Sequence, residues 1–132
     1  MKTYLPILAA FVIALKLHAD GTNSPAPLKI GAGEAAKYYD KEMIVTGNVA
    51  EVSIRSKVVL VNLDKAYPNS PFTIVVFAKA TNEFGNINAL YGKNVEAKGI
   101  IKNFKDKPEI VLDSSNQLTI LNFTNSPSSP KQ

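Results

Sequence analysis

Aromatic side chains stand beside cationic ones in several short stretches of this chain. The three aromatics are Tyr67, Phe77 and Phe104. The cations in or near the same stretches are Arg55, Lys57, Lys65, Lys79, Lys102, Lys105 and Lys107. A ring can stack on a nucleobase while an ammonium group contacts a phosphate, and each stacked base contributes roughly 1–3 kcal/mol. These ten residues therefore form a candidate binding surface for single-stranded nucleic acid or another anionic polymer.

The side chains needed for catalysis or metal binding are scarce. The chain has no cysteine and one histidine, His18, which lies in a segment that we expect to be removed. Without Cys and His, neither a thiol or Ser-His-Asp nucleophile nor a zinc–thiolate site is available. The acids are scattered along the chain, although Asp64, Asp106 and Asp113 could meet in space. We therefore expect a non-enzymatic protein without a cofactor or metal.

Two long stretches of period two indicate the strands that must position the candidate residues. In the first, Met43, Val45, Gly47 and Val49 alternate with more polar positions, and in the second the alternating set is Val95, Ala97, Gly99 and Ile101. This alternation is typical of half-buried antiparallel strands. Each stretch carries one mid-strand glycine, which predicts a bend or bulge where a curved sheet folds over on itself.

The remaining elements complete a small β-fold. We expect strands at about 43–54, 57–63, 72–79, 95–102 and 109–112, with residues 118–121 continuing the last one. A loop at 103–108 separates the last two main strands. Residues 81–90 are expected to form a short helix that Thr81 or Asn82 begins and Gly92 ends, and a second short helix begins at Glu34. Three strands, a helix and two strands is the order of the OB-fold, so the prediction is an all-β, five-stranded OB-fold Greek-key barrel with a short helix between strands three and four and a short N-terminal helix.

Several motifs also resemble a family. The stretches are Tyr91-x-Lys93-x-Val95, the run from Lys107 to Leu112, Leu63-x-x-x-Tyr67-Pro68, and the run from Phe72 to Val76. Together they are similar to small exported bacterial OB-fold proteins of the nucleic-acid-binding, tRNA-anticodon-binding-like OB superfamily. The resemblance covers about residues 32–122 and implies the OB-fold and a binding role.

The ends of the chain have a different composition. Lys2 and the apolar run Leu5–Leu15 precede Ala19, so residues 1–19 are typical of a cleaved signal peptide. The alternatives are an uncleaved N-terminal anchor and a frayed cytosolic segment. Eleven apolar residues are fewer than the roughly 20 that span a membrane. We expect a flexible lead-in at 20–31, the OB-fold domain at 32–123, a disordered tail at 124–132, and a periplasmic or secreted location. Cleavage removes two lysines and no acid, which lowers the net charge from +4 to +2.

OB-folds bind ligands on strands two and three and on the flanking loops, which is where the ten candidate residues are expected. Each aromatic also has a plain structural interpretation, because Phe77 could belong to the core, Tyr67 could pack a loop beside Pro68, and Phe104 could cover the open barrel end. The sequence therefore leaves two binding hypotheses open, beside an enzyme that would need a carboxylate cluster in a cleft. One is binding of single-stranded nucleic acid or another anionic polymer. The other is an exported envelope module that binds a small ligand, a glycan or a protein partner.

Overall fold

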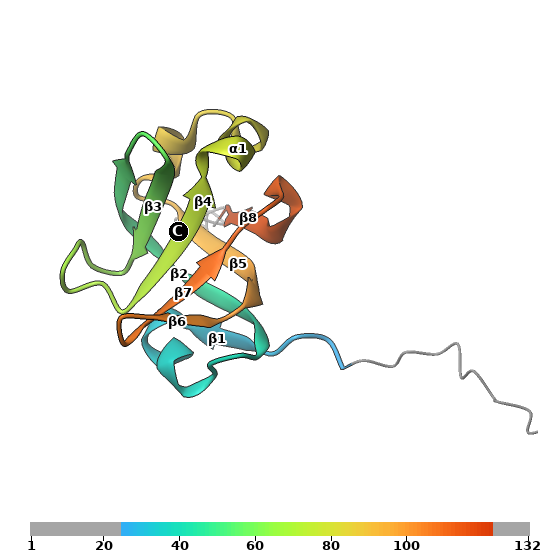
Figure 1. Cartoon of the computed structure of the whole chain (residues 1–132). Coiled ribbons are helices and arrows are strands. Elements are labelled where there is room, and N and C mark those ends of the chain that lie inside the picture. Colours follow the sequence, from blue (N-terminus) through green and yellow to red (C-terminus); the bar gives the residue numbers. More distant parts are fainter. Residues whose placement is uncertain (1–24, 123–132) are drawn as a thin grey trace, which may run out of the picture.

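The computed structural model describes residues 25–122, which form a mainly β protein with one short α-helix, α1 (Ala78–Thr81) (Figure 1). The eight strands of this part of the chain are β1 (Lys29–Gly31), β2 (Glu42–Ile54), β3 (Val58–Leu63), β4 (Phe72–Phe77), β5 (Asn94–Ile100), β6 (Lys102–Phe104), β7 (Lys107–Val111) and β8 (Leu118–Leu121). Four 3-10 helices are η1 (Ala32–Lys37), η2 (Asn82–Phe84), η3 (Ile87–Leu90) and η4 (Ser115–Gln117). The predicted order of three strands, a helical segment and two further strands is found in β2, β3, β4, the segment from α1 to η3, β5 and β7, and the strands β1, β6 and β8 are additional.

The strands form one mixed sheet in the order β6-β7-β4-β3-β2-β5-β8, with β1 paired to β2 beside this path. The pairs β1–β2 and β4–β7 are parallel, and the other pairs are antiparallel. Figure 1 shows β4 and β7 side by side, with α1 at one end of the molecule and β1 at the other. The two main strands that carry the predicted ligand face, β3 and β4, therefore lie in the middle of the path.

Strand β2 is shared between two parts of the sheet. Its first half pairs with β5 and its second half with β3, and a register shift between Val49 and Glu51 separates them. The predicted bend thus lies just after Gly47. At Gly47 itself a Cβ would meet Leu63 side-chain carbons at 3.1 Å, so this glycine permits the close approach of β2 to the end of β3.

The second long strand is interrupted, where the prediction was continuous. It divides at Ile101, and the first part (β5) pairs with β2 while the second (β6) pairs with β7. The predicted loop at 103–108 is instead a hairpin, because β6 and β7 extend to a two-residue turn. Lys105 and Asp106 in this turn have left-handed φ values of 49° and 62°, as a type I′ hairpin turn requires. The Asn103 side-chain oxygen accepts a hydrogen bond from the Asp106 N–H at 2.9 Å.

Alternation along β3, β4 and β7 separates a core face from an outer face. The core holds Val59, Val61 and Leu63 from β3, Phe72, Ile74 and Val76 from β4, and Ile110 from β7. The intervening residues point outward, so Thr73, Val75 and Phe77 lie on the outer face of β4. We use "outer face" below for this side of β2, β3, β4, β7 and β6.

The helical segment after β4 differs from the predicted helix at 81–90. It begins earlier, since β4 ends at Phe77 and Lys79 already belongs to α1. It then breaks into η2 and η3, because Gly85 adopts a φ of 59°. Thr81 does not cap the helix; its hydroxyl donates instead to the carbonyl of Phe77 within α1. Gly92 ends the segment with a φ of 77°, as predicted.

Both edges of the domain also correct the sequence-based expectations. The lead-in predicted at 20–31 contains β1, where Ile30 is buried and Lys29 forms an ion pair with Glu96 at 2.6 Å. Strand β8 does not continue the last main strand, because it pairs with β5 at the other end of the path.

The predicted N-terminal helix is η1, a 3-10 helix. The predicted signal peptide and tail lie outside the described residues, and within residues 25–122 no helix is long and apolar enough to cross a membrane.

Candidate nucleic-acid interface

The β6–β7 hairpin places Phe104 directly opposite Lys107. The Phe104 side chain is 57% exposed, and the ammonium group of Lys105 lies 5.4 Å from the centre of its ring. This distance is within the range of a cation–π interaction. The turn residues therefore present one accessible ring together with two cations.

The loop between β3 and β4 brings a second ring to the same place. Tyr67 in this loop is 74% exposed, and the Lys107 ammonium group lies 5.6 Å from the centre of its ring. The same ammonium group donates a hydrogen bond of 2.5 Å to the carbonyl of Pro68. Lys107 thus connects the loop to the hairpin. We call Tyr67, Phe104, Lys105 and Lys107 the hairpin cluster.

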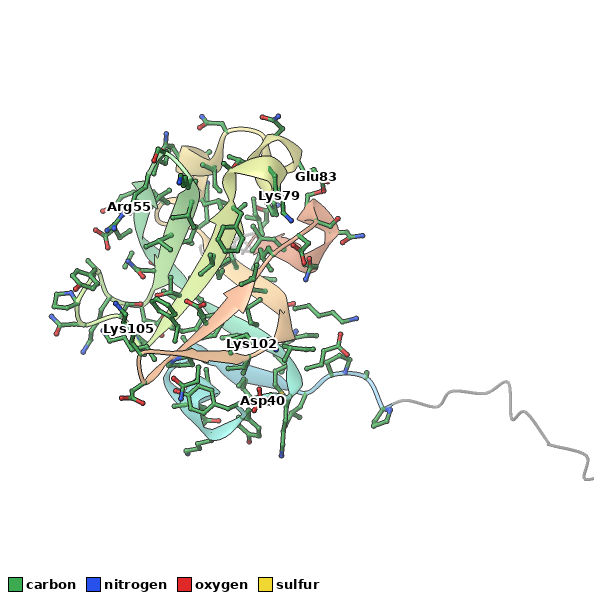
Figure 2. All side chains as sticks on the ribbon, viewed as in Figure 1. Asp40, Arg55, Lys79, Glu83, Lys102 and Lys105 are labelled. Atoms are coloured by element: carbon green, nitrogen blue, oxygen red, sulfur yellow. The ribbon has the colours of Figure 1, made fainter. Side chains whose placement is uncertain are left out.

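Four of the other candidate residues gather at the opposite end of the outer face. Phe77 ends β4 and pairs with Val58, and the Ala78 N–H donates to the Lys57 carbonyl at 3.0 Å. Figure 2 shows Arg55 and Lys79 at this end, while Lys102 and Lys105 lie at the other. Phe72 and Phe77 are five positions apart along β4, which corresponds to roughly 16 Å. The ten predicted residues therefore do not form a single cluster.

Exposure decides the plain interpretation of one of the three rings. Phe77 is 44% exposed and is not among the buried core residues, so its interpretation as a core residue is wrong. Tyr67 and Phe104 are more exposed still, and each has a lysine over its ring. Two candidates remain. Lys65 is exposed in the loop that carries Tyr67, and Lys102 of β6 lies opposite Glu109 of β7.

A row of polar residues crosses the outer face between the two ends, and sequence reasoning missed it. Strand register aligns Glu51 with Asn62, Asn62 with Thr73, and Thr73 with Glu109. One Glu51 oxygen accepts hydrogen bonds from the Asn62 carboxamide at 2.7 Å and from the Tyr67 N–H at 2.9 Å. The Thr73 hydroxyl donates to the Asn62 side-chain oxygen at 2.7 Å.

The two carboxyl groups of this row have opposite pKa shifts. The backbone hydrogen bond from Tyr67, followed by the bond from Asn62, lowers the pKa of Glu51. Partial burial raises the pKa of Glu109. Glu51 is therefore held as a carboxylate by donors, whereas Glu109 loses solvation without gaining a donor.

A shallow groove beside the hairpin carries mixed charge. It is lined by Glu42, Asp113 and Lys102 around Gly99, Ile100 and Val111. Two carboxylates make this groove unfavourable for phosphates, so the hairpin cluster is the better position for an anionic ligand.

The positions of the acidic residues show whether any of them form a group that could bind a metal. No group of three or more Asp, Glu, Cys or His residues lies close enough to hold a metal within residues 25–122. Asp64, Asp106 and Asp113 therefore do not meet there as a metal-binding set.

Comparison with known proteins places the chain by its fold alone. No family model matches the sequence, and no curated protein matches it either. OBody AM3L15 bound to hen egg-white lysozyme matches with a TM-score of 0.53 and 19% identity, over 70% of this chain and 92% of the OBody. OBody AM1L10, also bound to lysozyme, matches with a TM-score of 0.50 and 21% identity over 70% and 90%.

An aspartyl-tRNA synthetase is also similar in structure. The putative enzyme from Leishmania major Friedlin matches with a TM-score of 0.51 and 10% identity, over 77% of this chain and 22% of the synthetase. The chain thus spans about a fifth of that protein. The OB-fold part of the predicted resemblance is supported by these structures, and the sequence-family part is not.

Proposed function

We propose that the sheet is a five-stranded Greek-key barrel of the OB type, made of β2, β3, β4, the divided strand β5–β6, and β7. The pairing path supports this, because β6 lies at one end of it and β5 lies next to the other end, yet the two are consecutive in the chain and only Ile101 separates them. Strands β1 and β8 are additions to this barrel. A barrel of this kind has its ligand face on β3 and β4, between the first hairpin and the β6–β7 turn.

The proposed function is non-enzymatic binding of single-stranded nucleic acid, or of another anionic polymer, through this face and its flanking loops. The hairpin cluster carries the proposal, because two exposed rings and two lysines converge there from separate segments. Each lysine covers one side of a ring and leaves the rest accessible for stacking. Lys65 and Lys102 supply further positive charge nearby. The group at Phe77 is a secondary contact region for a longer strand.

Export remains part of the proposal, and it bears on the ligand. If residues 1–19 direct the chain out of the cytoplasm, its partners are found in the envelope or outside the cell. A protein, a glycan or a small ligand is then the alternative partner, and the OBodies bound to lysozyme are similar folds with a protein partner.

The test is binding of residues 20–132 to a fluorescent single-stranded oligonucleotide across a salt series. We expect micromolar affinity at low salt. In Tyr67→Ala or Phe104→Ala the affinity should fall by about 5- to 100-fold, because each substitution removes the ring on which one base stacks. The matched control is Phe77→Ala, an exposed ring at the other end of the face, which should change the affinity by less than either. Inorganic polyphosphate, which has the charge without the bases, tests the role of stacking.

The outcomes separate the hypotheses. No binding at low salt would overturn the nucleic-acid proposal, because the electrostatic attraction is strongest there. Equal binding of polyphosphate would identify an anionic-polymer site that does not use stacking. If no oligonucleotide binds, an envelope protein or a glycan becomes the expected partner.

A further inference from the structure

The loop that carries Tyr67 is fastened to the barrel at two neighbouring residues. The Tyr67 N–H donates to the Glu51 carboxylate of β2 at 2.9 Å. The carbonyl of the next residue, Pro68, accepts from the Lys107 ammonium group of β7 at 2.5 Å. The loop is therefore held from both sides of the outer face, and the Cα that carries its exposed ring lies between these two attachments along the backbone.

The attachment to Glu51 is itself supported by two more strands. The Asn62 carboxamide of β3 donates to the same Glu51 oxygen at 2.7 Å and accepts from the Thr73 hydroxyl of β4 at 2.7 Å. Asn62 is only 4% exposed, although it lies on the outer face. A buried amide whose hydrogen bonds are satisfied on both sides has little freedom to move. The hydrogen bonds from Thr73 to Asn62 and from Asn62 to Glu51 thus fix the carboxylate to which the loop is bound.

We propose that Glu51 is a positioning residue of the binding site, which holds the Tyr67 ring ready for its ligand without contacting that ligand. This inference rests on the proposed function. A ring that is already ordered loses less conformational freedom when a base stacks on it, so the affinity of the site increases. The lowered pKa of Glu51 agrees with this role, because the donors from Tyr67 and Asn62 keep the group ionised.

The negative charge of Glu51, taken alone, predicts the opposite effect on the affinity for an anionic ligand. A carboxylate close to a path for phosphates repels the ligand, so its removal should strengthen binding. The positioning role predicts that its removal weakens binding, because the loop loses its attachment to β2 and keeps only the one to Lys107. The sign of the change therefore distinguishes the two explanations.

The first measurement compares oligonucleotide affinity at one fixed salt concentration in three variants. Glu51→Ala removes the acceptor, and we expect about tenfold weaker binding. Glu51→Gln removes the charge but retains an acceptor oxygen, so we expect affinity within about twofold of the unmodified protein. The matched control is Glu109→Gln, which removes a carboxylate from the same polar row without a loop contact, and it should not weaken binding. Unchanged or tighter binding in Glu51→Ala would overturn the inference.

A second measurement does not depend on any ligand. Amide hydrogen exchange at Tyr67 should become faster in Glu51→Ala and remain slow in Glu51→Gln, while core amides such as Val61 keep their protection. Faster exchange with no oligonucleotide binding to any form of the protein would reject the proposed function and retain the positioning role. Unchanged exchange at Tyr67 would reject the positioning role, whatever the protein binds.

Discussion

Glu51 and Glu109 show how strongly local contacts decide the behaviour of one residue type. Both belong to the polar row of the outer face, and each pairs with a neighbour of the adjacent strand. Glu51 receives two donors, which lower its pKa, while Glu109 is partly buried and its pKa is raised. The two groups therefore affect stability in opposite directions when the pH changes.

The first prediction concerns this pH dependence. The ionised Glu51 stabilises the fold above its ordinary pKa of 4.5, and this contribution is lost as the pH falls through its lowered pKa. Glu109 destabilises the fold once the pH rises through its raised pKa. Urea unfolding at about pH 7 and about pH 3 measures the free energy of unfolding of each variant relative to the unmodified protein. Glu109→Gln should gain stability on going from pH 3 to pH 7, and Glu51→Gln should lose stability over the same change. Differences that are the same at both pH values would contradict the shifts.

The second prediction at this scale concerns Gly99. A Cβ at this position would lie 2.9 Å from the Cγ2 of Ile110, which is fully buried. Gly99→Ala should therefore lower the free energy of unfolding by about 1–3 kcal/mol, because the core must shift. The control is Gly33→Ala, where the Cβ meets open space and the backbone is not left-handed. This variant should be neutral or more stable by up to about 1 kcal/mol, and chemical denaturation measures both.

The chemistry of single residues was predictable only where it is local. Stretches that combine aromatics with cations are visible in the sequence, and Tyr67 and Phe104 are exposed as the proposed site requires. Lys107 lies over the Tyr67 ring and is paired with Phe104, while Phe77 lies apart, and this arrangement depends on strand register and on the path of the β3–β4 loop. The contacts of Glu51 reach 11 and 16 residues along the chain, and no local pattern indicates them.

At the scale of elements, short strands were the main omission. β6 has three residues, and its turn uses Lys105 and Asp106 at positive φ instead of an Asn-Gly pair. The usual hairpin signal was therefore missing. β1 also has three residues and follows a proline-rich stretch, so its composition resembles a linker. It exists because it pairs in parallel with β2, which is a long-range contact.

The third prediction tests whether β1 is part of the folded domain. Ile30 is 6% exposed and belongs to the core, while Leu28, two residues earlier, is 58% exposed. Ile30→Ala should cost about 2–5 kcal/mol of unfolding free energy, as for other large-to-small core substitutions. Leu28→Ala should change it by no more than about 0.5 kcal/mol. If residues 20–31 are only a flexible lead-in, the two variants will have the same stability.

At the scale of the whole molecule, the order of elements was predictable because each main strand carries its own periodic pattern. Strands β2, β3, β4, β5 and β7 all lie close to their expected positions. The division of one long strand at Ile101 was not predictable, since it depends on which partner each half finds. The structural relatives are at most 21% identical to this chain among those compared, so a similar fold is reached here with largely different side chains.

The last prediction concerns the charge of the molecule as a whole. Without residues 1–19 the net charge is only +2, so binding of an anionic strand must depend on local lysines and not on overall attraction. Each phosphate neutralised on a single strand contributes about −0.7 to the slope of log affinity against log salt. The hairpin cluster with Lys65 and Lys102 presents four lysines, which predicts a slope of about −3.

Substitution of two of these lysines tests that count. Lys102→Gln together with Lys105→Gln leaves the Lys107 contact to the loop intact and should reduce the steepness of the slope by about 1.4. Lys79→Gln, which removes a lysine at the other end of the outer face, should leave the slope unchanged. A slope near −5 that becomes shallower in Lys79→Gln would mean that the strand runs the full length of the face, from the hairpin cluster to Phe77. An unchanged slope in the double variant would exclude Lys102 and Lys105 as phosphate-binding residues and contradict the count of four lysines, because counterion release counts only the cations that meet phosphates.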